Sequence, residues 1–213
     1  MKHILAIAFC LLSVGQAVGQ DNSHGMMGVP KKPTSHIAIK TNLLYDIAAI
    51  PNISAELQLR RNWSVGLGYW HAWWSSDPSH RYWRTYGGEL YARKYIGTAA
   101  KRSPLSSHHL GVIGQAGTYD FEFGGTGYLS RFSYSAGVEY GYSFPVSKKI
   151  NIDISTALGY IGGKYNVYKP IDTHYVWQHD GHLNWIGPTK AEVSLVLQLG
   201  RNGDSSKKKG GDR

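Results

Sequence analysis

The chain of 213 residues has little charge and a single cysteine. Charged residues make up 17% of it, which is low for a soluble domain, and Cys10 lies in an apolar run near the N-terminus. We expect no disulfide and no thiol chemistry once that run is cleaved off. The chain also lacks the repeated apolar spans of about 20 residues that a helical membrane bundle requires. Its hydrophobic content of 42% excludes a disordered polar chain.

The first 19 residues have the pattern of a secretory signal peptide. Residues 1–3 are a short basic start, residues 4–14 are apolar, and small residues precede residue 20. We expect a flexible lead-in over residues 20–35 and a polar tail over residues 202–213. Three lysines in that tail, at 207–209, are interpreted as a solvated end, because an exported protein meets little nucleic acid. The sequence therefore predicts no nucleic-acid partner.

Residues 36–201 are predicted to form one all-β domain. The chain is rich in glycine and aromatic residues, with 26 glycines, 15 tyrosines and 7 tryptophans, as expected for many strands. Apolar and polar residues alternate with period two in eight stretches, with no helical stretch between them. These stretches are residues 37–47, 53–60, 63–74, 82–96, 110–121, 132–144, 150–160 and 189–199. Eight strands in antiparallel succession predict a closed barrel or a sandwich.

Aromatic residues favour a transmembrane barrel. Tyrosine and tryptophan occur where the apolar faces begin and end, as in the girdles of a barrel at two lipid interfaces. These residues are Tyr45, Trp63, Tyr69, Trp73, Tyr142, Tyr160 and Trp185. The opposite face is rich in glycine and serine, which suits a narrow interior. The sequence therefore favours an eight-stranded antiparallel transmembrane β-barrel.

The charges on the polar face nearly balance. We expect them to pair with one another inside the barrel, because an unpaired charge in a confined lumen is costly. The predicted lumen network consists of Lys40, Asp46, Glu56, Arg60, Glu89, Arg93, Glu139, Asp153, Lys190 and Glu192. Since eight strands leave room only for side chains, this network is expected to be a structural plug and not a pore.

The predicted outer loops carry the candidate interaction residues. With both chain termini in the periplasm, these loops fall near residues 48–52, 75–81, 122–131 and 162–184. The candidates are Trp73, Trp74, Arg81, Trp83, Arg84, Tyr168, His174, Trp177 and His179. Such aromatic and cationic side chains either bind a partner or form an interfacial belt with snorkelling cations, and the belt is the more common outcome.

The motifs for catalysis and metal binding are weak. The spacings among His174, His179 and His182 match no metal-ligand template, and the sequence has no G-x-S-x-G elbow. Residues 124–127 are glycine-rich but lack the lysine and helix of a phosphate-binding loop. We therefore expect no metal, no cofactor and no catalytic residue. A lipid-modifying hydrolase or acyltransferase with a Ser and His pair near the outer rim stays open as an alternative.

Five motifs are similar to those of a known family. They are KTNLLYD at 40–46, AWW at 72–74, HRYWR at 80–84, YKP at 168–170 and GPTKAEVSL at 187–195. From about residue 37 to residue 200 the chain resembles a family of uncharacterised outer-membrane β-barrel proteins of Bacteroidetes with a domain-of-unknown-function label. The resemblance implies a barrel fold and an outer-membrane location but no activity. Some members are encoded beside fimbrial subunits, which implies fimbrial or other surface proteins as partners.

The sequence thus predicts a non-enzymatic barrel in contact with outer-membrane lipid, with a structural or surface-interaction role in its outer loops. Alternatives are an accessory protein for fimbria or surface-fibre assembly, a soluble exported β-barrel that binds a small ligand, and the lipid-modifying enzyme. The membrane and soluble barrels differ in which face of the alternation lies inside. Periodicity does not decide that question.

Overall fold

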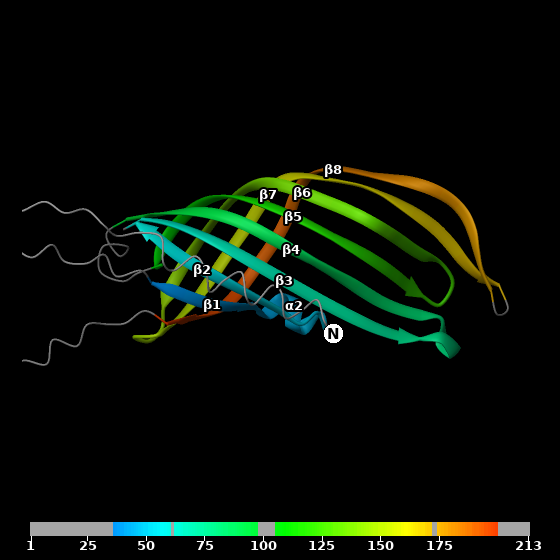
Figure 1. Ribbon diagram of the computed structural model, residues 1–213, viewed down its shortest axis with the longest axis horizontal. Coiled ribbons are helices and arrows are strands. Elements are labelled where there is room, and N and C mark those ends of the chain that lie inside the picture. Colours follow the sequence, from blue (N-terminus) through cyan, green and yellow to red (C-terminus); the bar gives the residue numbers. More distant parts are fainter. Residues whose placement is uncertain (1–35, 61, 98–104, 172–173, 200–213) are drawn as a thin grey trace, which may run out of the picture. The chain divides into compact units, whose positions relative to one another are not determined.

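The structure is a computed structural model that describes residues 36–60, 62–97, 105–171 and 174–199. These residues form eight antiparallel strands in one sheet, which Figure 1 shows. The strands are β1 (Ile37–Asn42), β2 (Asn52–Arg60), β3 (Trp63–Ser76), β4 (Arg81–Ile96), β5 (Ser107–Phe123), β6 (Gly127–Pro145), β7 (Ile150–Ile171) and β8 (His174–Gln198). The prediction of an all-β domain with eight antiparallel strands is confirmed. The predicted signal peptide, lead-in and tail lie outside the described residues.

The sheet closes on itself, but only over part of its length. Each strand pairs with the next, and β1 also pairs with β8, from Ala38–Gln198 to Asn42–Ser194. β7 and β8 continue as a paired hairpin to Ile171 and His174, far beyond the end of β1 (Figure 1). We call the part that β1 and β2 complete the proximal half and the part beyond it the distal half. In the distal half, the sheet runs from β3 to β8 and is open between these two strands.

The first strand is shorter than the alternation predicts. Helix α2 (Leu43–Ile47) follows β1, where the pattern indicates a continuing strand. The side-chain oxygen of Asn42 accepts a hydrogen bond from the Leu44 N–H at 3.1 Å. Asn52 accepts from the Asn42 N–H at 2.7 Å and donates to the Asn42 carbonyl at 3.1 Å. Two asparagine amides thus satisfy backbone groups that a strand ladder would otherwise pair, and the chain can turn into a helix.

Helix α2 lies near the opening of the distal sheet. It contacts β8, and the two residues that follow it bind β3 and β4. The indole N–H of Trp74 donates to the Ala49 carbonyl at 2.6 Å, and that of Trp83 donates to the Ala48 carbonyl at 2.8 Å. The segment after β1 therefore bridges the gap that the end of β1 leaves. Within the described residues, no helix is long and apolar enough to cross a membrane.

Strands replace much of the predicted outer loops. β7 and β8 occupy residues 162–171 and 174–184 of the predicted loop 162–184, and β5 and β6 leave only residues 124–126 of the predicted loop 122–131 outside the strands. The turn near residues 75–81 is present and contains the 3-10 helix η2 (Asp77–Ser79). The hairpin of β7 and β8 is rich in aromatic and β-branched residues, which favour strands. Both of its faces carry exposed side chains, and the period-two signal is lost there.

The interior of the proximal half is polar and its exterior is apolar. Lys40, Glu56 and Arg93 are at most 2% exposed, whereas Leu90 and Val138 are 64% and 63% exposed. The same orientation holds in β4 and β5. In β4, Arg93 is buried and Leu90 is exposed, and in β5, His109 is buried whereas Leu110 and Val112 are exposed. Polar side chains thus form most of the interior, together with a few apolar ones such as Ile113 and Val196. This arrangement is the reverse of a water-soluble barrel.

Candidate functional site

Arg93 lies at the centre of a buried ion network in the proximal half. Its Nε and Nη2 donate to the two carboxylate oxygens of Glu139 at 2.5 and 3.0 Å. Its Nη1 donates to Asp153 at 2.7 Å and to Glu56 at 3.4 Å, and its Nη2 also donates to Glu192 at 3.1 Å. These carboxylates come from β6, β7, β2 and β8. One guanidinium on β4 therefore joins four other strands across the lumen.

Two lysines extend the network on either side of Arg93. The Lys40 ammonium donates to Glu56 at 2.9 Å and to Asp153 at 3.0 Å. Lys190 lies 2.7 Å from Glu192 and donates to Glu89 at 3.0 Å. Three cations thus face five carboxylates, and further donors are needed to satisfy the remaining oxygens.

Hydroxyl and imidazole groups supply those donors. Ser64 donates to Glu56 at 2.5 Å, Tyr95 donates to Glu56 at 2.8 Å, and His109 Nε2 lies 2.8 Å from Asp153. The ring of Tyr91 lies beneath all three cations, with the Arg93 carbon 4.4 Å from its centroid. A cavity of about 20 Å³ borders the network at Glu89 and Lys190, which is room for about one water molecule. The arrangement is that of a hydrogen-bonded plug.

Eight of the ten predicted lumen residues meet in this network. Asp46 does not join them. It lies exposed on α2, where Thr41 and Asn52 donate to it at 2.8 and 3.0 Å, because the chain has left the strand before this residue. The side chain of Arg60 lies outside the described part of the structure. The sequence did not single out His109 or Tyr95 as members of the network. Tyr95 could have been identified, because it lies two residues after Arg93 and therefore on the same face of the strand.

In the distal half, the outward face of the barrel becomes concave. The strand register places Tyr82, Glu122, Gly127 and Tyr168 in one row across β4 to β7, on the same side of β4 as the outward Leu90. The Tyr82 hydroxyl nevertheless hydrogen-bonds to the Tyr175 hydroxyl of β8. Since three strands separate β4 from β8, the sheet must curl around this row for the two hydroxyls to meet.

A polar cluster fills the distal end of this concave face. The Arg84 guanidinium carbon lies 3.8 Å from the centroid of the Tyr82 ring, and Arg84 reaches Asp120 at 3.4 Å. Tyr168 donates to the other oxygen of Asp120 at 2.6 Å. Glu122 is fully buried, and neither of its carboxylate oxygens has a hydrogen-bond partner among the described residues. Burial raises the pKa of Glu122, and nearby His80 opposes the shift.

The structure separates the predicted interaction residues into two hairpins. In the first, Trp73 pairs with Arg84, Trp74 with Trp83, and Ser76 with Arg81 across β3 and β4. In the second, Tyr168 pairs with Trp177, Val167 with His179, and Ile171 with His174 across β7 and β8. The hairpins meet where Tyr175 contacts Tyr82 and Tyr168. In the described part of the chain, no three His, Cys, Asp or Glu side chains form a group that could hold a metal.

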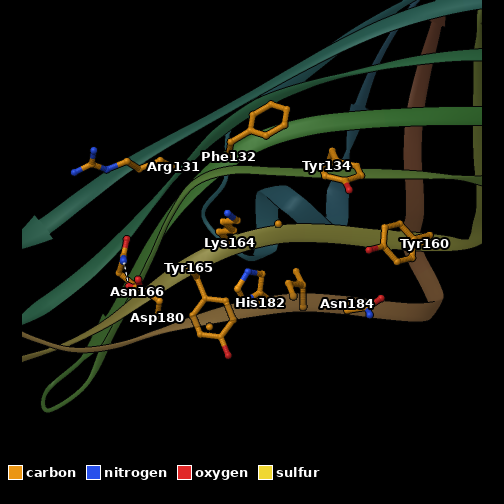
Figure 2. Close-up of a pocket in the computed structure, with 13 residues that line it drawn as sticks. Arg131, Phe132, Tyr134, Tyr160, Lys164, Tyr165, Asn166, Asp180, His182 and Asn184 are labelled. Atoms are coloured by element: carbon orange, nitrogen blue, oxygen red, sulfur yellow. Dashed lines mark hydrogen bonds between the residues drawn. The ribbon is translucent and has the colours of Figure 1, made fainter.

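A pocket of about 670 Å³ lies on the same concave face, between β6, β7 and β8 (Figure 2). Its cationic or potentially cationic lining residues are Arg131, Lys164 and His182. Its aromatic lining residues are Phe132, Tyr134, Tyr160 and Tyr165. The sequence did not predict this pocket, because most of these residues fall in segments that we expected to be loops. Only the pairing of β6, β7 and β8 brings them together.

The chain was also compared with known proteins. The model of a family described as "Protein of unknown function (DUF3575)" matches residues 6–199, a range that includes every strand of the sheet. No curated protein matches the chain.

Proposed function

We propose that this chain, which belongs to the DUF3575 family of proteins of unknown function, is an outer-membrane β-barrel with a surface-interaction role. In this proposal the proximal half is embedded in the membrane, and the distal half projects from it. The observation that carries the proposal is the reversed polarity of the proximal half, with Arg93 and its carboxylates inside and aliphatic side chains outside.

The apolar exterior is continuous from strand to strand. Leu67 pairs with Leu90 across β3 and β4, and Val138 pairs with both Val112 and Leu158 across β5, β6 and β7. All five side chains are 49% to 64% exposed. Soluble proteins rarely expose a contiguous apolar patch larger than a few hundred Å². A lipid environment would accommodate such a belt without cost, which supports membrane insertion.

The height of the apolar belt also suits a membrane. On β6, the exposed aromatic residues Tyr134 and Phe144 are ten residues apart. Ten residues of strand span about 34 Å, or about 26 Å along the axis of a barrel whose strands tilt by about 40°. The apolar band of known transmembrane barrels is about 25 Å tall. Because β3 to β8 contain 14 to 25 residues, their distal parts extend beyond such a band.

The lumen network supports a structural role for the interior. Each of its cations contacts two or more carboxylates, and Arg93 and Glu139 are at most 1% exposed. A plug of this kind leaves no open path for a solute. The concave distal face, with its exposed aromatic and cationic side chains, is therefore the part that we assign to interaction.

The proposal is tested by heat modifiability. Outer-membrane fractions of cells that express the full chain are run on a detergent gel with and without boiling. A closed, inserted barrel is expected to migrate faster before boiling than after it. A protein found in the soluble periplasmic fraction, with no difference between the two samples, would refute the membrane proposal and favour the soluble barrel.

A further inference from the structure

We infer that the pocket between β6, β7 and β8 binds the phosphate-bearing headgroup of an anionic lipid. The inference rests on the proposed function and deepens it, because it names the ligand class of the distal surface. In the proposed orientation, the pocket lies at the outer end of the apolar belt, where headgroups are found.

The cationic groups of the pocket come from three neighbouring strands. Phe132 of β6 pairs with Lys164 of β7, and Lys164 pairs with His182 of β8. Arg131 precedes Phe132 at a bulge in β6. Adjacent strands lie about 4.8 Å apart, so that Lys164 and His182 are close enough to contact one phosphate group together. Figure 2 shows Lys164 and His182 between Tyr134 and Tyr160 on one side and the Asn166–Asp180 pair on the other.

The donors of these three side chains are not used elsewhere in the described structure. Among the described residues, Arg131, Lys164 and His182 have no side-chain hydrogen bond, and of the three only His182 has an electrostatic partner, the Asp180 carboxylate. This contrasts with the lumen, where Arg93, Lys40 and Lys190 all face carboxylates. Free guanidinium and ammonium donors in a shared pocket are suited to a phosphate, which offers several acceptor oxygens.

The one acidic residue of the pocket is held by neutral donors. Trp177 donates to Asp180 Oδ1 at 2.8 Å, and Asn166 donates to the same oxygen. These hydrogen bonds lower the pKa of Asp180, so that it stays ionised at neutral pH. Arg131 and Lys164 together outweigh this single negative charge, and the pocket has a net positive charge even when His182 is neutral.

The aromatic wall of the pocket favours a lipid over a free anion. Phe132 and Tyr134 lie on the same side of β6 as Val138 and are 60% and 46% exposed. Tyr160 stands next to Tyr134, with ring centroids 6.1 Å apart, and Leu158 follows on the same strand. The pocket thus continues into the apolar belt without a polar interruption at these positions. A ligand with its phosphate in the pocket would lay its acyl chains along the belt.

The test is lipid binding by the purified full chain in neutral detergent micelles. The probes are phosphatidic acid, phosphatidylcholine and inorganic phosphate, and binding is measured by native mass spectrometry and by the shift of the thermal unfolding midpoint. We expect phosphatidic acid to bind at least tenfold more tightly than phosphatidylcholine. The double variant Arg131→Gln with Lys164→Gln should bind phosphatidic acid at least tenfold more weakly than the unaltered chain does.

A matched control removes two charges elsewhere. Lys148→Gln with Lys149→Gln changes the net charge equally, but both lysines lie exposed in the turn between β6 and β7, at the opposite end of the barrel. This variant should bind phosphatidic acid as the unaltered chain does. Equal losses in the two double variants would overturn the inference, because binding would then follow net charge alone. Tight binding of inorganic phosphate would also overturn it, in favour of a soluble anion.

Failure of the inference and failure of the proposed function are distinguishable. The heat-modifiable band is recorded for each variant before the binding measurement. A chain that shows the band but prefers no phosphate-bearing lipid contradicts only the pocket assignment. A chain without the band contradicts the membrane barrel itself.

Discussion

At the scale of single residues, the lumen depends on one arginine. Arg93 contacts four carboxylates at 3.4 Å or less and is fully buried. Its planar fork of five N–H donors matches this task, which a lysine ammonium could not perform with the same geometry. Glu122 is the opposite case, a buried carboxylate with no hydrogen-bond partner among the described residues. Each of these two side chains supports a prediction.

Replacing Arg93 by methionine should destabilise the barrel by about 3–5 kcal/mol, because four carboxylates then lose their shared cation in a buried site. The urea concentration at half-unfolding, measured in detergent, checks this result. Arg81→Met is the control, since Arg81 is exposed on the same strand. Its effect should stay within about 0.5 kcal/mol. Equal midpoints for the two variants would contradict a central role for Arg93.

Glu122→Gln should stabilise the chain more at pH 7 than at pH 4. Because burial raises the pKa of Glu122 in the folded state, the unfolded chain ionises first, at about 4.3. The stability that the protonated carboxyl contributes is therefore complete below that value and is lost as pH rises through the folded pKa. The glutamine amide does not ionise, so the variant keeps its stability as pH rises. Urea midpoints of both proteins between pH 4 and pH 8 measure the difference, and a gap that shrinks with rising pH would refute the prediction.

At the scale of elements, the close approach of two strands depends on glycine. Gly137 pairs with Gly159 across β6 and β7, and a Cβ at residue 159 would lie 2.1 Å from the Ala136 carbonyl oxygen. That oxygen belongs to the backbone, so no side-chain movement can relieve the clash. The tight pairing of β6 and β7, two of the three strands that carry the pocket, thus requires glycine at this position.

Gly159→Ala should therefore weaken the ladder between β6 and β7. We expect faster amide hydrogen exchange on both strands and a lower thermal midpoint. Gly125→Ala is the matched control, because a Cβ at residue 125, in the turn between β5 and β6, meets no atom within 4 Å. If both variants exchange at the rate of the unaltered chain, the close approach has no energetic importance.

At the scale of the whole molecule, the reversed polarity leads to a prediction that differs between a lipid and an aqueous environment. Val138 on the belt and Val146 in the turn between β6 and β7 are both 63% exposed. In water, arginine at either position would change the stability by about 0.5 kcal/mol or less. In a membrane, the two positions differ, because only Val138 lies within the apolar belt.

Val138→Arg should cost about 2–4 kcal/mol in a bilayer, as expected for a cation on the lipid face near the midplane. Val146→Arg should cost much less. The fraction of each variant that assembles into lipid vesicles as a heat-modifiable form is the measurement. Full assembly of Val138→Arg would count against membrane insertion.

The sequence alone was enough to identify the eight strands of the proximal half, but not their extensions into the distal half, which were predicted to be loops. Side chains alternate with period two along a strand, so that local order already places Glu139 and Val138 on opposite faces. The same pattern failed at residues 43–47, because side-chain hydrogen bonds from Asn42 and Asn52 compete with the ladder. The three lysines of the predicted tail and the predicted signal peptide lie outside the described residues.

Only the tertiary structure decided which face is the interior and which charges meet. Arg93 contacts Glu56, Glu139, Asp153 and Glu192, which lie up to 99 residues away along the chain. They meet because the pairing of β1 with β8 closes all eight strands around one lumen. The concave distal face likewise arises from the curl of the sheet beyond the end of β1, which joins Tyr82 to Tyr175. Alternation is a local property of a strand, whereas closure and curl depend on pairing between distant strands.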